Sequence, residues 1–239
     1  MASHQPSPRA GRATADVYCP GEDSVITIFS EILERSEEVS PPQRYPATVE
    51  LYRQGTAATE VYYIESGLVK LVRSEQGGQE LITDLRFPGY LLGEASLISN
   101  RPHPLTAVTL VESRLWRITA SVFCRLLKSD EQFARGIRQM QSREAYDNVS
   151  RITQLGCVQA RHRLEHMLRL LIKAQGAKAP RESVRLEVPL KNWELAQLIA
   201  VTPTYLSRLF GRLEKDEMLR RRAGWVIVPD PQKLWRWSE

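Results

Sequence analysis

The sequence predicts an α+β protein in which an antiparallel β-roll precedes a long helix and a C-terminal helix-turn-helix with a β-hairpin. Residues 44–118 contain short alternating runs separated by glycine and proline, residues 119–175 show helical periodicity, and residues 189–222 hold two short helical patterns that meet at a turn. Many short strands with regular turn signals are typical of an antiparallel sandwich or roll.

The composition is that of an ordinary globular chain. Hydrophobic residues make up 42% and charged residues 26% of the 239 residues, which is close to the globular average. No apolar stretch approaches the roughly 20 residues of a membrane helix, and the N-terminus lacks the apolar segment of a secretory signal. Three scattered cysteines form neither a disulfide framework nor a metal knuckle. We therefore expect a cytoplasmic protein that does not contact a membrane.

The organisation along the chain predicts four segments. We expect a disordered tail at 1–22, a β-roll domain at 23–130 that begins with an amphipathic helix over Ser24–Glu38, a long helix at 131–158 and a helix-turn-helix domain at 159–239. Gln175–Arg185 should form a loop within the last segment.

Positive charge is concentrated in the last third of the chain. Residues 160–239 contain 16 Lys and Arg against 9 Asp and Glu, a balance of +7, whereas residues 1–159 carry −2. Such asymmetry indicates a polyanionic partner for the C-terminal domain.

Thr202 and Pro203 predict the start of the second short helix, as N-cap and first helical residue. Leu206, Leu209, Phe210 and Leu213 would face the neighbouring helix, which leaves Thr204, Ser207, Arg208 and Arg212 pointing outward. A short cationic helix face on a two-helix scaffold is what the DNA major groove admits. The alternative is an ordinary helical hairpin with solvated arginines.

Residues 131–155 contain no proline and one glycine, so we predict a single long helix. Its apolar stripe is narrower than a globular core needs, which favours pairing with a second copy of the helix in a homodimer. Ile137, Met140, Val149 and Ile152 are the predicted interface residues. The alternative is a helix that lies along its own domain.

The order of these elements resembles the CRP/FNR family of bacterial transcription regulators over almost all of residues 24–229. The motifs that carry the resemblance are Glu194-Leu195-Ala196, Ser207-Arg208, Leu213-Glu214-Lys215, the run Tyr62 to Gly67, Pro88-Gly89 and Gly93-Glu94. The resemblance implies a cyclic-nucleotide-binding-like roll, a dimerisation helix and a winged helix-turn-helix. It also implies a non-enzymatic DNA-binding regulator, and no catalytic motif is evident.

By this resemblance, Arg208 reads a base edge and Thr204 and Ser207 contact bases or phosphate, while Tyr205 contacts phosphate. Three arginines at the start of the hairpin should position the domain on phosphates. The full set of predicted DNA contacts is Thr202, Pro203, Thr204, Tyr205, Ser207, Arg208, Arg212, Arg220, Arg221 and Arg222. The resemblance further implies a near-palindromic double-stranded site and RNA polymerase as a partner.

Three positions depart from the family pattern. Thr204 stands where many members have glutamate, so the half-site should differ from the commonest consensus. Ala200 occupies the inter-helix turn where glycine is usual, and a left-handed alanine there costs about 1 kcal/mol. Lys191 replaces the usual Thr or Ser cap of the first helix.

The effector is not evident from the roll. Gly93 and Glu94 match the ribose-binding pair of members that bind cyclic AMP, but His103-Pro104-Leu105-Thr106 supplies no arginine for the cyclic phosphate. A buried anion without a charged partner is costly, which argues against cyclic AMP. The candidate effector pocket is Gly93, Glu94, His103 and Thr106.

No other cofactor is evident. An iron–sulfur sensor needs four cysteines, mostly near the N-terminus, where only Cys19 stands. Haem with His103 as axial ligand stays open. His162 and His166 have zinc-compatible spacing, but no third ligand is evident.

The sequence thus predicts a dimeric, sequence-specific DNA-binding regulator that responds to an unidentified effector at the roll. One alternative is a cyclic-nucleotide or small-ligand module that signals through a protein partner rather than DNA. Another is constitutive regulation, with the roll only a scaffold.

Overall fold

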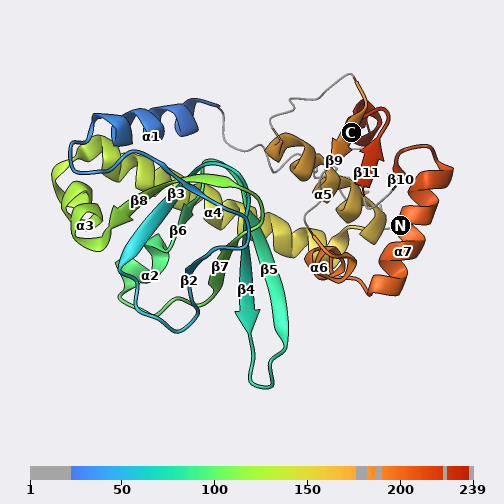
Figure 1. Ribbon diagram of the computed structural model, residues 1–239, viewed down its shortest axis with the longest axis horizontal. Helices are drawn as coiled ribbons and strands as arrows, with labels where there is room; N and C mark the ends of the chain where they lie inside the picture. The colour runs from blue at the N-terminus through green and yellow to red at the C-terminus, as the bar shows by residue number, and fades with distance from the viewer. Residues whose placement is uncertain (1–22, 176–181, 187–189, 223–224, 237–239) are drawn as a thin grey trace, which may run out of the picture.

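The computed structural model describes residues 23–175, 182–186, 190–222 and 225–236. The roll and the C-terminal domain lie at opposite ends of the molecule, and the long helix α4 runs from one to the other (Figure 1). The elements of the roll are α1 (Asp23–Arg35), β1 (Gln43–Tyr45), β2 (Glu50–Tyr52), β3 (Glu60–Ser66), β4 (Val69–Ser74), β5 (Glu80–Arg86), β6 (Leu91–Leu92), α2 (Glu94–Ser99), β7 (Thr106–Thr109), β8 (Ser113–Thr119) and α3 (Ala120–Ser129).

The predicted antiparallel roll is confirmed. One sheet has the strand order β1-β8-β3-β6 and the other β2-β7-β4-β5, and every pair is antiparallel. The alternating runs predicted within residues 44–118 correspond to β2, β3, β4, β5, β7 and β8. Strands β1 and β6 were not predicted, because segments of three and two residues are too short for an alternating pattern.

Helix α4 (Glu131–Cys157) confirms the predicted long helix, and its N-terminal half packs on its own roll. Phe133 of α4 lies 5.3 Å from Phe29 of α1, measured between ring centroids. Ile137 and Met140 are 1% and 7% exposed and belong to the same core cluster. This half of α4 therefore follows the alternative in which the helix lies along its own domain.

The C-terminal half of α4 has the opposite character. Four large apolar side chains remain exposed there: Tyr146 at 63%, Val149 at 63%, Ile152 at 70% and Leu155 at 42%. Each lies three residues from the next, so successive members adjoin and the four form an apolar stripe that winds around the helix. An apolar stripe of this kind marks a surface that another molecule can cover.

The C-terminal domain contains α5 (Ala160–Ala174), β9 (Val184–Leu186), α6 (Asn192–Leu198), α7 (Pro203–Lys215), β10 (Arg220–Arg222), β11 (Trp225–Val228) and α8 (Gln232–Arg236). Its sheet has the order β10-β11-β9. The predicted hairpin is present as β10 and β11. The expected loop over Gln175–Arg185 is wrong at its end, because Val184 and Arg185 pair with β11.

Several expectations fall outside the described residues, namely the tail at 1–22, most of the loop that follows Gln175, and the hairpin turn at Ala223-Gly224. Within the described ranges, no helix combines the length and the apolar character needed to cross a membrane.

Candidate nucleic-acid interface

Helix α7 begins as its sequence predicts. Thr202 is the N-cap, and its Oγ1 accepts a hydrogen bond from the backbone N–H of Tyr205 at 3.2 Å. Pro203 occupies the first helical turn, where its missing N–H leaves no bond unmade. The start of the helix is thus fixed by local hydrogen bonding, and its free N–H groups form a favourable environment for an anion such as phosphate.

The two faces of α7 differ sharply in exposure. Leu206, Leu209, Phe210 and Leu213 are at most 2% exposed and hold the helix against the rest of the domain. The exposed side chains are Pro203, Thr204, Tyr205, Ser207, Arg208, Arg212 and Lys215. Figure 1 shows α7 at the outer side of the domain, with α6 between it and the roll. The helix therefore presents a polar, cationic face away from the sensor end of the molecule.

Ser207 already uses its hydroxyl proton within the helix. Its Oγ donates to the carbonyl oxygen of Pro203 at 3.1 Å. The remaining lone pairs can still accept a hydrogen bond. Within the structure, Ser207 is thus left as a hydrogen-bond acceptor.

The turn between α6 and α7 keeps a left-handed residue, although alanine stands where glycine is usual. Ala200 has φ +51°. Arg163 of α5 binds this turn, since its Nε donates to the carbonyl of Ile199 at 2.9 Å and its Nη2 to that of Ala200 at 3.3 Å. Its Nη1 also donates to the carbonyl of Val158, between α4 and α5. One side chain therefore connects the end of the long helix to the helix-turn-helix turn.

The three arginines of β10 do not share one role. Arg221 forms two hydrogen bonds with the carboxylate of Glu214, at 3.2 and 2.9 Å, and its guanidinium lies 5.0 Å from the ring centroid of Phe210. These hydrogen bonds lower the pKa of Glu214. Arg221 thus fastens the hairpin to α7. Arg220 and Arg222 are exposed, and neither forms an ion pair within the described residues.

Helix α6 docks on the roll through two polar contacts. Glu194 is buried; it accepts a hydrogen bond from Lys70 Nζ of β4 at 2.7 Å and another from the backbone N–H of Lys191, also at 2.7 Å. Gln197 accepts from the N–H of Ile82 at 3.0 Å and donates to the carbonyl of Glu80 at 3.1 Å. The side chain of Gln197 therefore extends the hydrogen bonding of β5.

Comparison with known families agrees with both halves of this architecture. The sequence profile described as "Cyclic nucleotide-binding domain" matches residues 42–130, and that described as "Crp-like helix-turn-helix domain" matches residues 162–237. The two matches stand in the order of the roll and the helix-turn-helix, on either side of α4.

The chain belongs to the CRP/FNR family. It is thereby a DNA-binding transcription regulator with a cyclic-nucleotide-binding-like sensor domain, in a family whose members are dimeric and are not enzymes.

Similar proteins of known name are regulators from several bacteria. The cyclic AMP receptor protein of Thermus thermophilus is 25% identical over 190 residues, which cover 80% of this chain and 84% of that protein. The fumarate and nitrate reduction regulatory protein of Vibrio cholerae is 24% identical over 214 residues, covering 89% and 82%.

Solved structures of similar fold include FixK2 from Bradyrhizobium japonicum, with a TM-score of 0.67 and 20% identity over 83% of this chain and 96% of that one. The c-di-GMP responsive global regulator CLP from Xanthomonas campestris has a TM-score of 0.64 and 21% identity over 87% and 99% of the two chains.

In this CRP/FNR regulator, the four candidate effector residues do not surround one space. His103 stacks on Tyr52 with ring centroids 3.9 Å apart, and it lies so close to Gly93 that an added Cβ there would be 3.2 Å from His103 Cε1. Thr106 accepts a hydrogen bond from the N–H of Gln54 at 3.0 Å. Glu94 lines a small cavity beside α4, and Thr106 lines a different one at the outer surface.

The charges around Glu94 do not fit a cyclic phosphate. Burial, with a smaller contribution from Glu144, raises the pKa of Glu94 to about 7. Arg86, the nearby arginine, is buried and already contacts Glu144 and Asp84. An anion at this place would lie near the carboxylates of Glu144 and Asp84 and the carboxyl group of Glu94, which agrees with the argument against cyclic AMP.

His103 does not fit the role of an axial haem ligand. Its ring is 3% exposed, and one face is covered by Tyr52, so a macrocycle has no room beside it. Its Nδ1 is buried and has no hydrogen-bond partner among the described residues. Burial also lowers the pKa of His103.

Zinc at His162 and His166 gains no support from the geometry. His162 is exposed, whereas His166 is half-buried beside Arg169. Across the described part of the chain, no three His, Cys, Asp or Glu side chains gather in a way that could hold a metal ion.

Proposed function

We propose that this regulator binds a near-palindromic DNA site as a homodimer, with α7 of each protomer in a major groove. The observation that carries the proposal is the exposed polar face of α7, held out from the domain by four buried apolar side chains. A cationic helix face of this width matches the major groove.

Within this proposal, the exposed residues divide into base readers and phosphate contacts. Arg208 lies in the first half of α7, where its guanidinium can hold guanine O6 and N7 together. Thr204 and Ser207 would contact neighbouring base edges. Phosphate contacts are assigned to Thr202, Pro203, Tyr205, Arg212, Arg220 and Arg222, of which the first two lie at the positive N-terminus of α7.

Arg221 receives a different role from the one expected from its sequence neighbours. Its guanidinium is engaged by Glu214, and residues on a strand alternate between two faces. We therefore propose that Arg221 sets the position of the hairpin while Arg220 and Arg222 contact phosphates.

The proposed dimer interface is the exposed stripe on the C-terminal half of α4. Val149 and Ile152 belong to it, together with Tyr146 and Leu155. Ile137 and Met140 are withdrawn from the interface because they are buried in the core of their own protomer. Two stripes packed together would bury apolar area and place the two α7 helices about 34 Å apart, one DNA turn.

The same proposal gives this chain RNA polymerase as a partner and the bacterial cytoplasm as its location. A regulator of this family acts on promoter DNA in the compartment that holds the genome. The similar proteins include a cyclic AMP receptor protein and a c-di-GMP responsive regulator, so relatives within this fold differ in the effector that their names record.

Footprinting on the DNA upstream of the protein's own gene tests the proposal. We expect two protected patches related by a two-fold axis, and affinity should fall linearly on a plot of log K against log salt. A one-sided footprint would contradict the dimer geometry. An absence of DNA binding at low salt would favour the alternative in which the C-terminal domain contacts a protein.

A further inference from the structure

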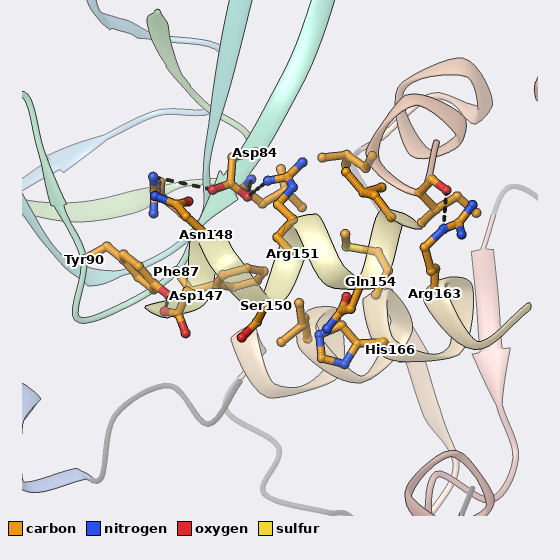
Figure 2. Close-up of a pocket in the computed structure, with 17 residues that line it drawn as sticks. Asp84, Phe87, Tyr90, Asp147, Asn148, Ser150, Arg151, Gln154, Arg163 and His166 are labelled. Carbon is orange, nitrogen blue, oxygen red and sulfur yellow. Dashed lines mark hydrogen bonds and ion pairs between the residues drawn. The ribbon is translucent and has the colours of Figure 1, made fainter. Parts of the chain in front are cut away.

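A cavity of about 90 Å³ lies where the roll, α4 and the DNA-binding domain meet (Figure 2). Its walls come from residues 84–90 of the roll, the C-terminal half of α4, α5 and the end of α6. It thus lies outside the roll and is separate from Gly93 and His103. Any molecule bound there would touch both domains at once.

Most of the wall is apolar. Leu85 and Phe87 of the roll, Leu170 of α5, and Leu198 and Ile199 at the end of α6 face the cavity. Such a lining takes the apolar body of a ligand, with a few polar groups to fix its orientation.

His166 of α5 lines this cavity and has one hydrogen-bond donor to offer. Its Nδ1 lies 3.3 Å from Arg169 Nη2, and because an arginine can only donate, Nδ1 must be the acceptor. The proton of the neutral ring is therefore on Nε2. Burial, followed by the charges of Arg169 and Lys173, lowers the pKa of His166 to about 4, so the neutral form is present at pH 7. Gln154 of α4 also lines the cavity and is half-exposed.

The two ends of the cavity differ in charge. At the roll end, Asp84 contacts Arg151, and Asp147 accepts a hydrogen bond from the hydroxyl of Tyr90 at 2.6 Å. At the α5 end, no carboxylate within the described ranges contacts Arg163 or Lys173. Positive charge is therefore less compensated near His166, which favours an anionic group there.

The size of the cavity limits the ligand. A protein cavity of about 150 Å³ is known to admit benzene, so one of about 90 Å³ suits roughly three or four carbons. We propose that this junction cavity binds a short-chain monocarboxylate, with its carboxylate at His166 and Gln154 and its carbon chain against Leu170, Leu198 and Ile199. The ligand acts as an effector because it contacts the long helix α4 and the helix-turn-helix domain together.

Coupling to DNA binding has a direct structural route. Ile199 lines the cavity, and its carbonyl accepts a hydrogen bond from Arg163, which also binds Ala200 in the turn before α7. Leu155 lines the cavity and belongs to the exposed stripe of α4. A ligand can therefore shift both the turn and the dimer interface. The effect of this shift on DNA binding rests on the proposed function, whereas the binding of the ligand does not.

Calorimetric titration of the full chain with propionate, and with propionamide as its uncharged counterpart, tests the site. We expect propionate to bind at least about tenfold more tightly than propionamide, since a hydrogen bond to a charged group is the stronger one. His166→Phe and Gln154→Leu should each weaken propionate binding about tenfold. His162→Phe, on the exposed face of the same helix, is the matched control and should bind like the wild type.

Equal binding of propionate and propionamide, no binding of either, or binding that neither variant weakens would overturn the site. The effector role is tested by measuring the affinity for DNA with and without propionate. A change in the affinity of the wild type that Gln154→Leu abolishes supports the role. An unchanged affinity overturns it. DNA affinity without any ligand tests the proposed function alone, so the two failures are distinguishable.

Discussion

Individual side chains decide what α7 and its hairpin can do with DNA. The sequence assigned Arg220, Arg221 and Arg222 to one role, phosphate contact. The structure separates them, because Glu214 holds Arg221 while the other two are exposed. The partner of Arg221 is seven residues away on a different element, so no local pattern reveals it.

Arg208→Ala should lower affinity for the preferred site and remove the preference at one base pair of each half-site. The lost bidentate contact is worth about 1–3 kcal/mol of discrimination. Arg222→Ala should weaken all sequences alike and make the salt dependence less steep. Binding measurements on a set of single-base site variants distinguish these results. An unaltered sequence preference in Arg208→Ala would show that Arg208 does not read a base.

Glu94 makes stability depend on pH in a predictable direction. Burial raises its pKa from about 4.5 to about 7, so the folded state holds a proton that the unfolded state releases. The stability this provides is complete below about pH 4.5 and is lost as the pH rises to about 7. Compared with Glu94→Gln, which cannot titrate, the wild type should lose about 3 kcal/mol over this window.

Urea unfolding of both proteins at pH 5 and pH 8 measures that difference. His166 acts in the opposite direction, because its lowered pKa reduces stability as the pH falls from about 6.5 to about 4. Both proteins contain His166, so its effect cancels. Parallel pH profiles for wild type and Glu94→Gln would show that Glu94 is ionised in the folded state.

At the scale of elements, α4 shows how far the sequence could be interpreted. Its length and its narrow apolar stripe were predictable because proline is absent and helical spacing is local. Which surface each half of α4 packs against was not predictable. Ile137 and Met140 are covered by α1 and the roll, which are distant in sequence, whereas Val149 and Ile152 extend beyond them.

The crossing of α1 and α4 depends on the small size of Gly136. An added Cβ would lie 2.8 Å from Phe29 Cδ2, inside the core of the roll. Gly136→Ala should therefore destabilise the protein by about 1–3 kcal/mol despite alanine's better helix propensity. Gly156→Ala in the same helix meets nothing within 4 Å and should cost nothing. Thermal or urea unfolding compares the two, and equal stabilities would refute the close contact.

Strand β9 likewise depends on contacts that are distant in the sequence and could not be predicted. Three residues carry too little alternation to be recognised, and β9 forms only because β11 offers an edge. The capped start of α7 was predictable, since it depends on neighbours in the sequence. The sequence left open whether Ala200 takes a left-handed conformation, which it does with φ +51°.

For the whole molecule, the decisive property is association through α4. Ile152→Glu places a charge at the centre of the exposed stripe and should shift the protein to monomers with much weaker DNA binding, because each protomer then contacts one half-site. Gln132→Glu is the control, since Gln132 is exposed on the same helix but lies about four turns before the stripe. Light scattering gives the masses. A dimer that survives Ile152→Glu would place the interface elsewhere.

Selection of binding sites from random double-stranded DNA, with the full-length wild-type protein, tests the central claim most directly. Two copies of α7 related by a two-fold axis should enrich inverted repeats whose half-site centres lie about 10 base pairs apart. Enrichment of single, unrepeated sites, or of no sequence at all, would contradict the account.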